Sequence, residues 1–155
     1  MTDDEAMGLA LHEASKALDH GDVPVGAVIV SAAGEVLARR HNERELTKDP
    51  TAHAEILALR DAATKLGAWR LDGVTLFVTL EPCPMCAGAL LASRTARVVF
   101  GTPDPKAGAT GSLYNLCADP RLNHEVAVVH GVRAVESAAL LTEFFSGRRR
   151  APDPA

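Results

Sequence analysis

The sequence predicts an α/β protein, a three-layer α/β/α sandwich in which a mixed central sheet of about five strands lies between layers of helices. Segments of helical periodicity alternate with short apolar runs rich in β-branched residues along most of the chain. Two of these runs are separated only by a short turn, which favours an antiparallel hairpin. The others are joined through helices, which favours parallel pairs, so the sheet is expected to contain both kinds of pairing.

A helix and a hairpin open the chain. Apolar residues between positions 3 and 20 are spaced largely as one helical stripe, which ends near Gly21. The apolar run 25–30 and the segment 35–40 flank a turn at Ser31–Gly34. Their lengths and their β-branched residues predict two strands that pair through this turn.

The middle of the chain contains two predicted helices with a strand between them. Residues 53–66 show the helical period, and Gly67 ends that segment. Residues 74–80 form a short apolar run, which predicts a strand. Residues 83–93 are small and apolar, and they begin among prolines that suit a helix entry, where a missing backbone N–H costs nothing.

The last third of the chain is expected to contain strands at 97–100 and 125–130 and an amphipathic helix at 136–146. No repeat, low-complexity tract or linker divides the sequence, so we expect residues 1–150 to form a single domain. The tail 151–155 has too little apolar surface to pack and is expected to be disordered.

Composition is ordinary for a soluble globular protein, with 47% hydrophobic and 23% charged residues among 155. A cytoplasmic location is the default expectation, because thiolates free to hold a metal fit a reducing compartment. No stretch reaches the ~18 apolar residues of a membrane helix. The acidic start is unlike a secretory signal, and three cysteines do not make a disulfide framework. A net charge of −4 argues against non-specific coating of nucleic acid, but a local basic patch could still bind RNA. The strongest basic cluster, Arg148–Arg150, is read first as a solubilising helix end that suits the C-terminal helix dipole.

Two short motifs predict a catalytic zinc site. His53, Cys83 and Cys86 supply the imidazole and thiolate ligands that tetrahedral zinc binds. Three protein ligands leave the fourth position open for a water, which zinc acidifies towards neutral pH. Glu55 stands two residues after His53 and is the expected proton carrier beside that water. The predicted activity is that of a zinc-dependent hydrolase.

Other interpretations of these residues remain open on the sequence alone. A lone C-x-x-C also occurs in redox pairs, and a structural zinc site would need a fourth ligand such as Cys117, His124 or His130. A zinc-stabilised binding module without catalysis is a third interpretation. His53 and Glu55 would face nearly opposite sides of a regular helix, so they share a site only if it lies over the helix end.

The two motifs, H-x-E and P-C-x-x-C, resemble the signature of the zinc-dependent nucleobase and nucleoside deaminases, whose fold is cytidine deaminase-like. Over roughly residues 5–150 the chain also resembles the bacterial tRNA-specific adenosine deaminases. The matching stretches are Val23–Val28, His41–Asn42, Asp49–Ile56, Thr79–Ala89, Arg97–Gly101, Gly108–Leu113, Leu122–His124 and Phe144–Phe145. The Gly-rich loop and the tail indicate this branch, whereas the zinc motif alone indicates only a deaminase.

This resemblance implies conversion of adenosine to inosine at the wobble position of a tRNA anticodon, usually that of arginine tRNA. Zinc-activated hydroxide would attack C6 of adenine while Glu55 shuttles the proton. Asn42 matches the position that hydrogen-bonds the purine, and the Ala54 N–H matches a second contact. Asp104 lies in the loop along the single-stranded anticodon. Members of the family act as homodimers, and one zinc ion per subunit is expected.

A zinc deaminase of a free base or nucleoside, such as guanine, cytosine or cytidine, is the alternative within the same fold and mechanism. Asn42 as a turn residue and Asp104 as a solvated loop residue are alternative interpretations of the two side chains. Pro103 and Pro105 stiffen the loop around Asp104, which bears on its fit to flanking nucleotides. Cys117 has no role that the sequence assigns.

Overall fold

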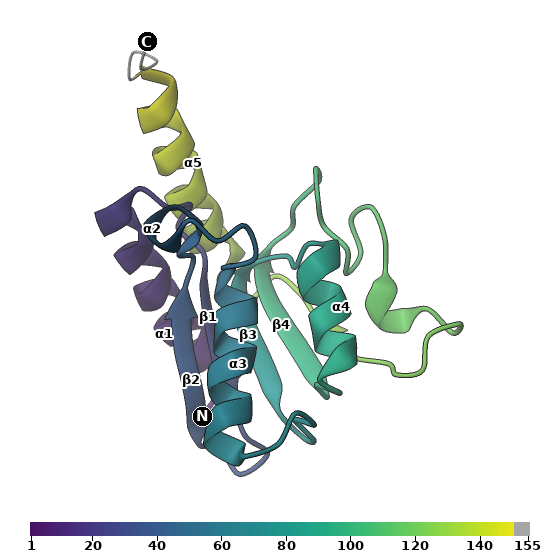
Figure 1. Cartoon of the computed structure of the whole chain (residues 1–155). Coiled ribbons are helices and arrows are strands. Elements are labelled where there is room, and N and C mark those ends of the chain that lie inside the picture. The colour runs from purple at the N-terminus through teal and green to yellow at the C-terminus, as the bar shows by residue number, and fades with distance from the viewer. Residues whose placement is uncertain (151–155) are drawn as a thin grey trace.

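The computed structural model describes the backbone of residues 1–150 and the side chains of residues 1–148 (Figure 1). A five-stranded mixed sheet forms its centre, with the strand order β2-β1-β3-β4-β5. The strands are β1 (Gly26–Val30), β2 (Val36–His41), β3 (Thr75–Leu80), β4 (Arg97–Thr102) and β5 (Ala127–Val129). The helices are α1 (Asp3–Lys16), η1 (Ala17–His20), α2 (Arg44–Thr47), α3 (Ala54–Leu66), α4 (Pro84–Ala92), η2 (Leu116–Ala118) and α5 (Ala134–Arg150).

The pairing of the strands mixes both directions, as the sequence predicts. Strand β1 is antiparallel to β2 and also to β3, while β3, β4 and β5 are parallel neighbours. Helix α3 connects β2 to β3, and these strands run in the same direction, yet β1 lies between them. The expected hairpin is confirmed, and its first strand also pairs with β3 on its other edge.

Helices cover both faces of the sheet and make three layers, which confirms the expected sandwich. Helices α1 and α5 cover one face, and α3 and α4 cover the other (Figure 1). Side chains alternate across the strands, so that Val28, Phe77 and Val99 pack towards α1. Their neighbours Ile29 and Leu76 pack towards α3 and α4 in a second core.

Helix α1 is fixed at its start and along its buried face. Thr2 and Glu5 form a capping box, in which each side chain bonds the backbone N–H of the other residue. Strand β1 approaches the helix so closely that a Cβ atom on Gly26 would lie 1.9 Å from the carbonyl oxygen of Ala10. Only glycine allows this contact, which brings the first helix directly against the sheet.

Several boundaries differ from the prediction. Helix α3 starts at Ala54 with His53 as its N-cap, and β5 is shorter than the expected strand 125–130. The short helices α2 and η2 are new, because four and three residues are too few to show a period. The predicted disordered tail 151–155 lies outside the described residues. Among helices of the described chain, none is long and apolar enough to cross a bilayer.

Candidate active site

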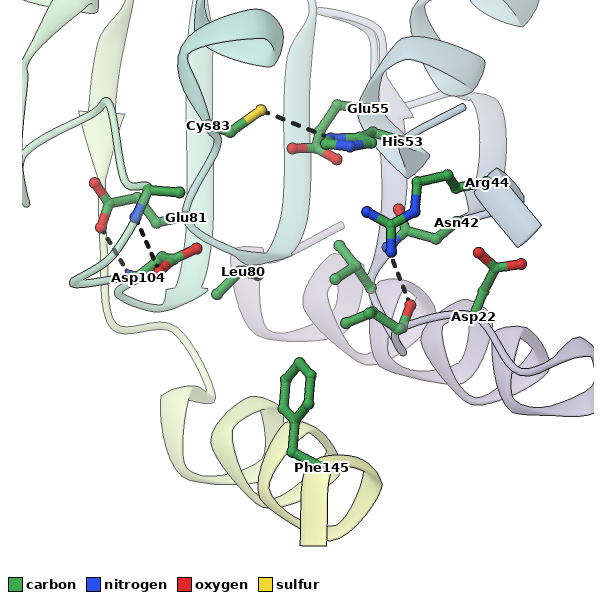
Figure 2. A pocket seen from close by; sticks show the side chains of 13 residues that line it. Asp22, Asn42, Arg44, His53, Glu55, Leu80, Glu81, Cys83, Asp104 and Phe145 are labelled. Carbon is green, nitrogen blue, oxygen red and sulfur yellow. Dashed lines mark hydrogen bonds between the residues drawn. The ribbon is translucent and has the colours of Figure 1, made fainter. Parts of the chain in front are cut away.

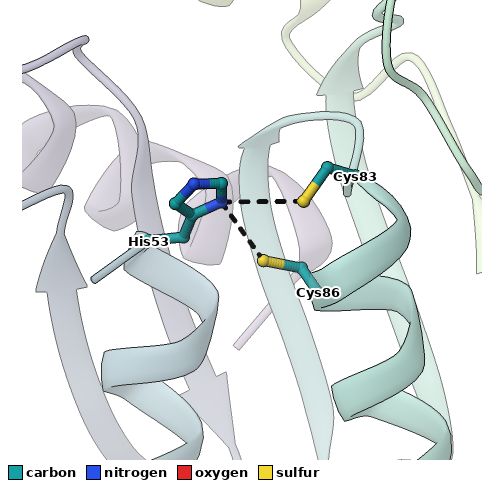
Figure 3. A group of neighbouring side chains, drawn as sticks. All are labelled: His53, Cys83 and Cys86. Atoms are coloured by element: carbon teal, nitrogen blue, oxygen red, sulfur yellow. Dashed lines mark hydrogen bonds between the residues drawn. The ribbon is translucent and has the colours of Figure 1, made fainter. Parts of the chain in front are cut away.

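The ends of two helices meet beside the carboxyl end of β3. His53 is the N-cap of α3 and Cys83 is the N-cap of α4, and both have extended backbone conformations, with ψ of 150° and 174°. Their side chains therefore project across the starts of their helices (Figure 3). Because His53 precedes the helix and Glu55 lies in its first turn, the two share one site without facing opposite sides of a helix.

Three side chains converge on a point suited to a metal ion. The Nδ1 atom of His53 lies 3.6 Å from the Cys83 Sγ and 3.5 Å from the Cys86 Sγ (Figure 3). The three candidate ligand atoms all lie within 4.8 Å of one another. Cys86 is buried, while His53 and Cys83 are partly exposed, so the cluster is open on one side. The predicted ligand set is brought together as one candidate metal site.

The close contacts within this cluster shift the pKa values of its three side chains. Hydrogen bonding with Cys86, and also with His53, lowers the pKa of the Cys83 thiol to about 4 in spite of its burial. The contact with Cys83, together with burial, raises the pKa of Cys86. Hydrogen bonding to Cys83 raises the pKa of His53. A lowered pKa favours the thiolate form of Cys83, which is the form that binds a metal cation.

Glu55 is a buried carboxyl group that borders the same pocket as His53 and Cys83 (Figure 2). Burial raises its pKa above the ordinary value of 4.5, although His53 nearby opposes this shift. The side chain is held by the first turn of α3. A buried carboxyl group next to a metal ligand set is the arrangement expected of a general acid and base.

The pocket over this cluster has a volume of about 240 Å³. Most of its lining comes from the ends of strands and from the loops that follow them (Figure 2). The lining residues are Asp22, Val23, Val25, Asn42, Arg44, His53, Glu55, Leu80, Glu81, Cys83, Asp104, Ala107 and Phe145. Phe145 belongs to α5, so this last helix contributes to the wall of the pocket.

Asn42, the predicted purine contact, lines the pocket with a fixed orientation. Its Oδ1 accepts the Ala54 N–H at 2.8 Å, and its Nδ2 donates to the Val23 carbonyl at 3.0 Å. Only one assignment of the amide satisfies both partners, and it leaves one N–H of Nδ2 for the pocket. The Ala54 N–H is already engaged by Asn42, so a substrate atom would share it as a bifurcated bond.

Asp104, the predicted loop residue, also borders the pocket. Its Oδ1 accepts the backbone N–H groups of Lys106 and Ala107, at 3.0 and 3.2 Å, which shapes the turn that Pro105 begins. Its own backbone N–H donates to Glu81 at 3.0 Å. Asp104 thus organises the loop at the edge of the site.

Among the lining residues that had no assigned role in the sequence analysis are Asp22, Arg44, Glu81 and Phe145. Glu81 accepts hydrogen bonds from the backbone of residues 104, 110 and 112, and these bonds keep its pKa below the ordinary value although burial opposes them. The sequence could have pointed to Glu81, because this charged residue directly follows an apolar strand and directly precedes the Pro-Cys pair.

The alternative zinc ligands lie elsewhere in the fold. Cys117 is buried in the core, where burial raises its pKa to about 11. His124 Nε2 bonds the Thr95 carbonyl at 2.8 Å, and the His130 ring lies 6.1 Å from that of Phe100. Over residues 1–148, the His53, Cys83 and Cys86 group is the one cluster placed to hold a metal ion, which leaves three protein ligands rather than four.

Comparison with known proteins identifies the family. The profile of the MafB19-like deaminases matches residues 1–149. The tRNA-specific adenosine deaminase of Bacillus subtilis is 51% identical over 151 residues, which make up 97% of this chain and 93% of that protein. This chain belongs to the tRNA-specific adenosine deaminase family. It is a deaminase, and the cytidine deaminase-like fold expected from the sequence is confirmed.

Solved structures agree with this assignment. A structure from a study of A-to-I editing by tRNA:A34 deaminases at the wobble position of transfer RNA matches with a TM-score of 0.85 and 44% identity. That match covers 88% of this chain and 99% of the other. A guanine deaminase from Bacillus subtilis covers 100% of this chain and 99% of its own, at 30% identity and a TM-score of 0.65. Identity is thus lower to this free-base deaminase than to the wobble-position structure.

Proposed function

We propose that this chain converts adenosine to inosine at the wobble position of a tRNA anticodon, with arginine tRNA as its substrate. The 51% identity to a tRNA-specific adenosine deaminase over nearly the whole chain is the observation that carries the proposal. Residues 1–150 would form one deaminase domain, and the match of the deaminase profile to residues 1–149 supports this. We place the enzyme in the cytoplasm, where tRNA is found and thiolates stay reduced.

The metal in this proposal is zinc. A tetrahedral zinc ion about 2.0 Å from nitrogen and about 2.3 Å from sulfur holds those two kinds of atom about 3.5 Å apart. The observed separations of 3.6 and 3.5 Å between His53 Nδ1 and the two sulfurs fit this value. One histidine and two cysteines are also a ligand set that zinc takes with an open fourth position. Bound zinc supplies an acidified water as the nucleophile for C6 of adenine.

Glu55 moves the protons in this scheme. Its side chain lines the same pocket as His53, where the water and the purine ring would meet. It would take one proton from the attacking water and deliver it to the ring nitrogen next to C6. It would then take the second proton from the new C6 hydroxyl group and deliver it to the amine, which leaves as ammonia while the C6 carbonyl forms. Burial keeps bulk water from competing for these transfers.

Asn42 and Ala54 orient the base. The free N–H of the Asn42 amide is a donor for an acceptor on the purine, such as N7. The Ala54 N–H holds the Asn42 carbonyl oxygen at 2.8 Å and so fixes the direction of that donor. A base held by few but fixed polar contacts is positioned for attack at one ring atom.

An RNA substrate is supported by the surroundings of the pocket. A second hollow of about 400 Å³ adjoins it and is lined by residues 102–106 and by α5. Phe145 and Asp104 line both hollows, so a nucleotide next to the target base can lie in continuous space. Phe145 is exposed and offers an aromatic face for stacking, which single-stranded RNA uses. Arg44 adds a cation at the rim of the first pocket.

The same proposal includes a homodimer. A hollow lined almost entirely by apolar atoms lies over α3 and α4, with Trp69 63% exposed at its edge. Its lining residues are Ile56, Leu59, Arg60, Ala63, Trp69, Leu71, Ala89, Ala92 and Ser93. Exposed apolar surface of this kind is typical of a contact between subunits. A second copy of the chain is the partner that we propose for it.

Inosine formation in a synthetic arginine-tRNA anticodon stem-loop with a wobble adenosine tests the substrate. Free guanine, cytosine, cytidine and adenosine are assayed beside it under the same conditions. The Glu55→Gln variant is the matched control, because it keeps the shape of the side chain and leaves all three metal ligands in place. We expect inosine in the stem-loop alone, and none with the variant although its zinc content is unchanged.

Two outcomes would overturn parts of the proposal. If the enzyme deaminates a free base and not the stem-loop, the proposed substrate is wrong, while the proposed mechanism still stands. Full activity in the Glu55→Gln enzyme would remove Glu55 from proton transfer.

A further inference from the structure

Glu81 is a buried carboxylate in the wall of the catalytic pocket. It follows the last residue of β3, is 2% exposed, and stands two positions before Cys83. Its backbone N–H donates to the Thr102 carbonyl at 3.0 Å, which continues the pairing of β3 with β4. The backbone at Glu81 is therefore held by the sheet, and its side chain extends from a rigid base.

Four hydrogen bonds converge on this carboxylate, and all come from the loop 104–112. The backbone N–H groups of Asp104, Thr110 and Ser112 donate at 3.0, 3.2 and 3.0 Å. The Ser112 hydroxyl also donates to it. One side chain thus binds both ends of the loop and determines the distance between them.

No cation shares the charge of Glu81 among the side chains that the structure describes. A buried carboxylate without a counter-ion is costly unless hydrogen bonds satisfy it. The donors of the loop supply those bonds, so the charge and the loop conformation stabilise each other. A glutamine at this position would offer only one acceptor oxygen, and its own NH₂ group would face N–H donors of the loop.

The loop backbone also packs tightly on the carboxylate. A Cβ atom on Gly108 would lie 2.3 Å from the Glu81 carboxylate, so the loop can come this close only with glycine at that position. The Ala109 N–H donates to the Pro82 carbonyl at 2.8 Å. The loop is thus joined to two successive residues of the segment that carries the metal ligand Cys83.

The part of the loop held in this way forms pocket wall. Asp104 and Ala107 line the catalytic pocket, and Asp104 also lines the adjoining hollow beside α5. Asp104 is itself one attachment point, and Ala107 lies between it and the next one at Thr110. Their position relative to the metal ligands therefore depends on the bonds to Glu81.

We propose that Glu81 is a positioning residue that sets the enzyme's selectivity for the nucleotides next to the target adenosine, because its carboxylate holds the loop 104–112 as a fixed wall. This inference rests on the proposed function for its substrate, an RNA single strand. Glu81 acts through the loop and does not touch the reacting atoms. Its loss is expected to weaken binding and selectivity while the chemical step is retained.

The Glu81→Gln variant tests the proposal with two kinds of measurement. Hydrogen exchange at the amides of Asp104, Thr110 and Ser112 is expected to accelerate about tenfold or more, since the bonds to a charged acceptor are lost. The KM for the anticodon stem-loop is expected to rise about tenfold with kcat within about twofold. Discrimination between stem-loops that differ in the nucleotide beside the wobble adenosine is expected to shrink by a similar factor.

Asp3→Asn is the matched control for lost stability. It neutralises the carboxylate that receives two bonds of 2.8 Å from Arg97, at the start of α1 and away from the pocket. The Asp3→Asn variant is expected to match the wild type in hydrogen exchange at the loop amides, in KM and in discrimination between neighbouring nucleotides. If Glu81→Gln does not fold, Ser112→Ala removes only the hydroxyl donor and is expected to change the same quantities in the same direction.

The possible outcomes are distinct. If the loop amides of Glu81→Gln exchange hydrogen at the wild-type rate, the proposal is overturned. It is also overturned if exchange is faster but the KM and the discrimination between stem-loops are unchanged. A wild-type enzyme that is inactive on the stem-loop overturns the proposed function instead. In that case the exchange experiment still decides whether Glu81 holds the loop.

Discussion

The Asn42 side chain and the Ala54 backbone are joined by a hydrogen bond of 2.8 Å at the edge of the candidate metal site. This bond connects the residue after β2 with the first residue of α3. A second bond, from Asn42 Nδ2 to the Val23 carbonyl, leaves the side chain no freedom to flip without losing both partners. One amide proton therefore points to the pocket in a defined direction before any substrate binds.

Asn42→Asp separates this donor function from the bond to Ala54. A carboxylate at position 42 still accepts the hydrogen bond from the Ala54 N–H, but it cannot donate one to a purine. Its second oxygen also faces the Val23 carbonyl oxygen, and two acceptors repel each other. We expect kcat/KM on the stem-loop to fall about 10- to 100-fold, as for the loss of one fixed hydrogen bond in a desolvated site. Steady-state kinetics measure the effect, and zinc content stays at the wild-type value. An unchanged kcat/KM would mean that Asn42 does not contact the base.

The two motif cysteines are expected to differ from the third in their effect on metal binding. Cys83→Ser replaces a thiolate ligand by a hydroxyl group that zinc binds poorly, so the purified variant is expected to lose most of its metal and activity. Cys117→Ala is the control, because Cys117 lies in the core and is not part of the candidate ligand cluster. Metal analysis of the purified proteins checks this. Equal loss of metal in both variants would contradict the three-ligand site.

Asp22 gives the fold a predictable dependence on pH. Burial raises the pKa of this carboxyl group, but hydrogen bonds from the Glu45 N–H, from His20 and from the Leu46 N–H outweigh it, so the pKa lies below 3.8. The donors lie at 2.8, 2.6 and 3.2 Å from the carboxylate oxygens. A group with a lowered pKa contributes stability above its ordinary pKa and loses that contribution as the pH falls through the folded value.

Asp22→Asn is therefore expected to lower the free energy of unfolding by about 1–3 kcal/mol at neutral pH. The difference from wild type is expected to shrink as the pH falls below 3.8, where the wild-type carboxylate takes up its proton. Urea unfolding at a series of pH values measures both. Asp61→Asn, which removes an exposed pair with Arg40, is the control and is expected to cost less than about 1 kcal/mol. A difference that stays constant into acid would contradict the role of the Asp22 charge.

Trp69→Glu tests the homodimer. The variant places a charge at the edge of the exposed apolar surface over α3 and α4, so we expect it to be monomeric at concentrations where wild type is a dimer. Val135→Glu is the control, because Val135 is 84% exposed on α5, outside this surface. Light scattering gives the mass of each, against 16.3 kDa for one chain. A monomeric wild type, or a dimeric Trp69→Glu protein, would contradict the proposed interface.

The fold was predictable where its signals are local. The hairpin of β1 and β2 and the helix α3 follow from periodicity and from turn residues next to them in sequence. The pairing of β1 with β3 was not predictable, because it joins residues about fifty positions apart and no local pattern specifies it. Helix α2 has only four residues and is capped by Asp22, which lies 23 positions before Glu45.

The candidate site likewise has residues that the sequence predicts and residues that it does not. His53, Cys83 and Cys86 were predicted because the chemistry of zinc restricts its ligands to a few residue types at short spacings. The part played by Glu81 depends on donors 23 to 31 positions later, whose backbone N–H groups carry no residue-type signal at all. Asn42 was assigned only through family resemblance, and its bond to Ala54 shows in addition what fixes its orientation.

The place of Phe145 in the pocket wall has a consequence for how the enzyme is made. His53, Cys83 and Cys86 all precede it, and the last of them by 59 positions. At about 5–20 residues per second, a ribosome adds Phe145 about 3–12 seconds after Cys86. The three candidate ligands thus leave the ribosome before the α5 residue that lines the same pocket, so the candidate metal site is complete in sequence before that part of its wall is made.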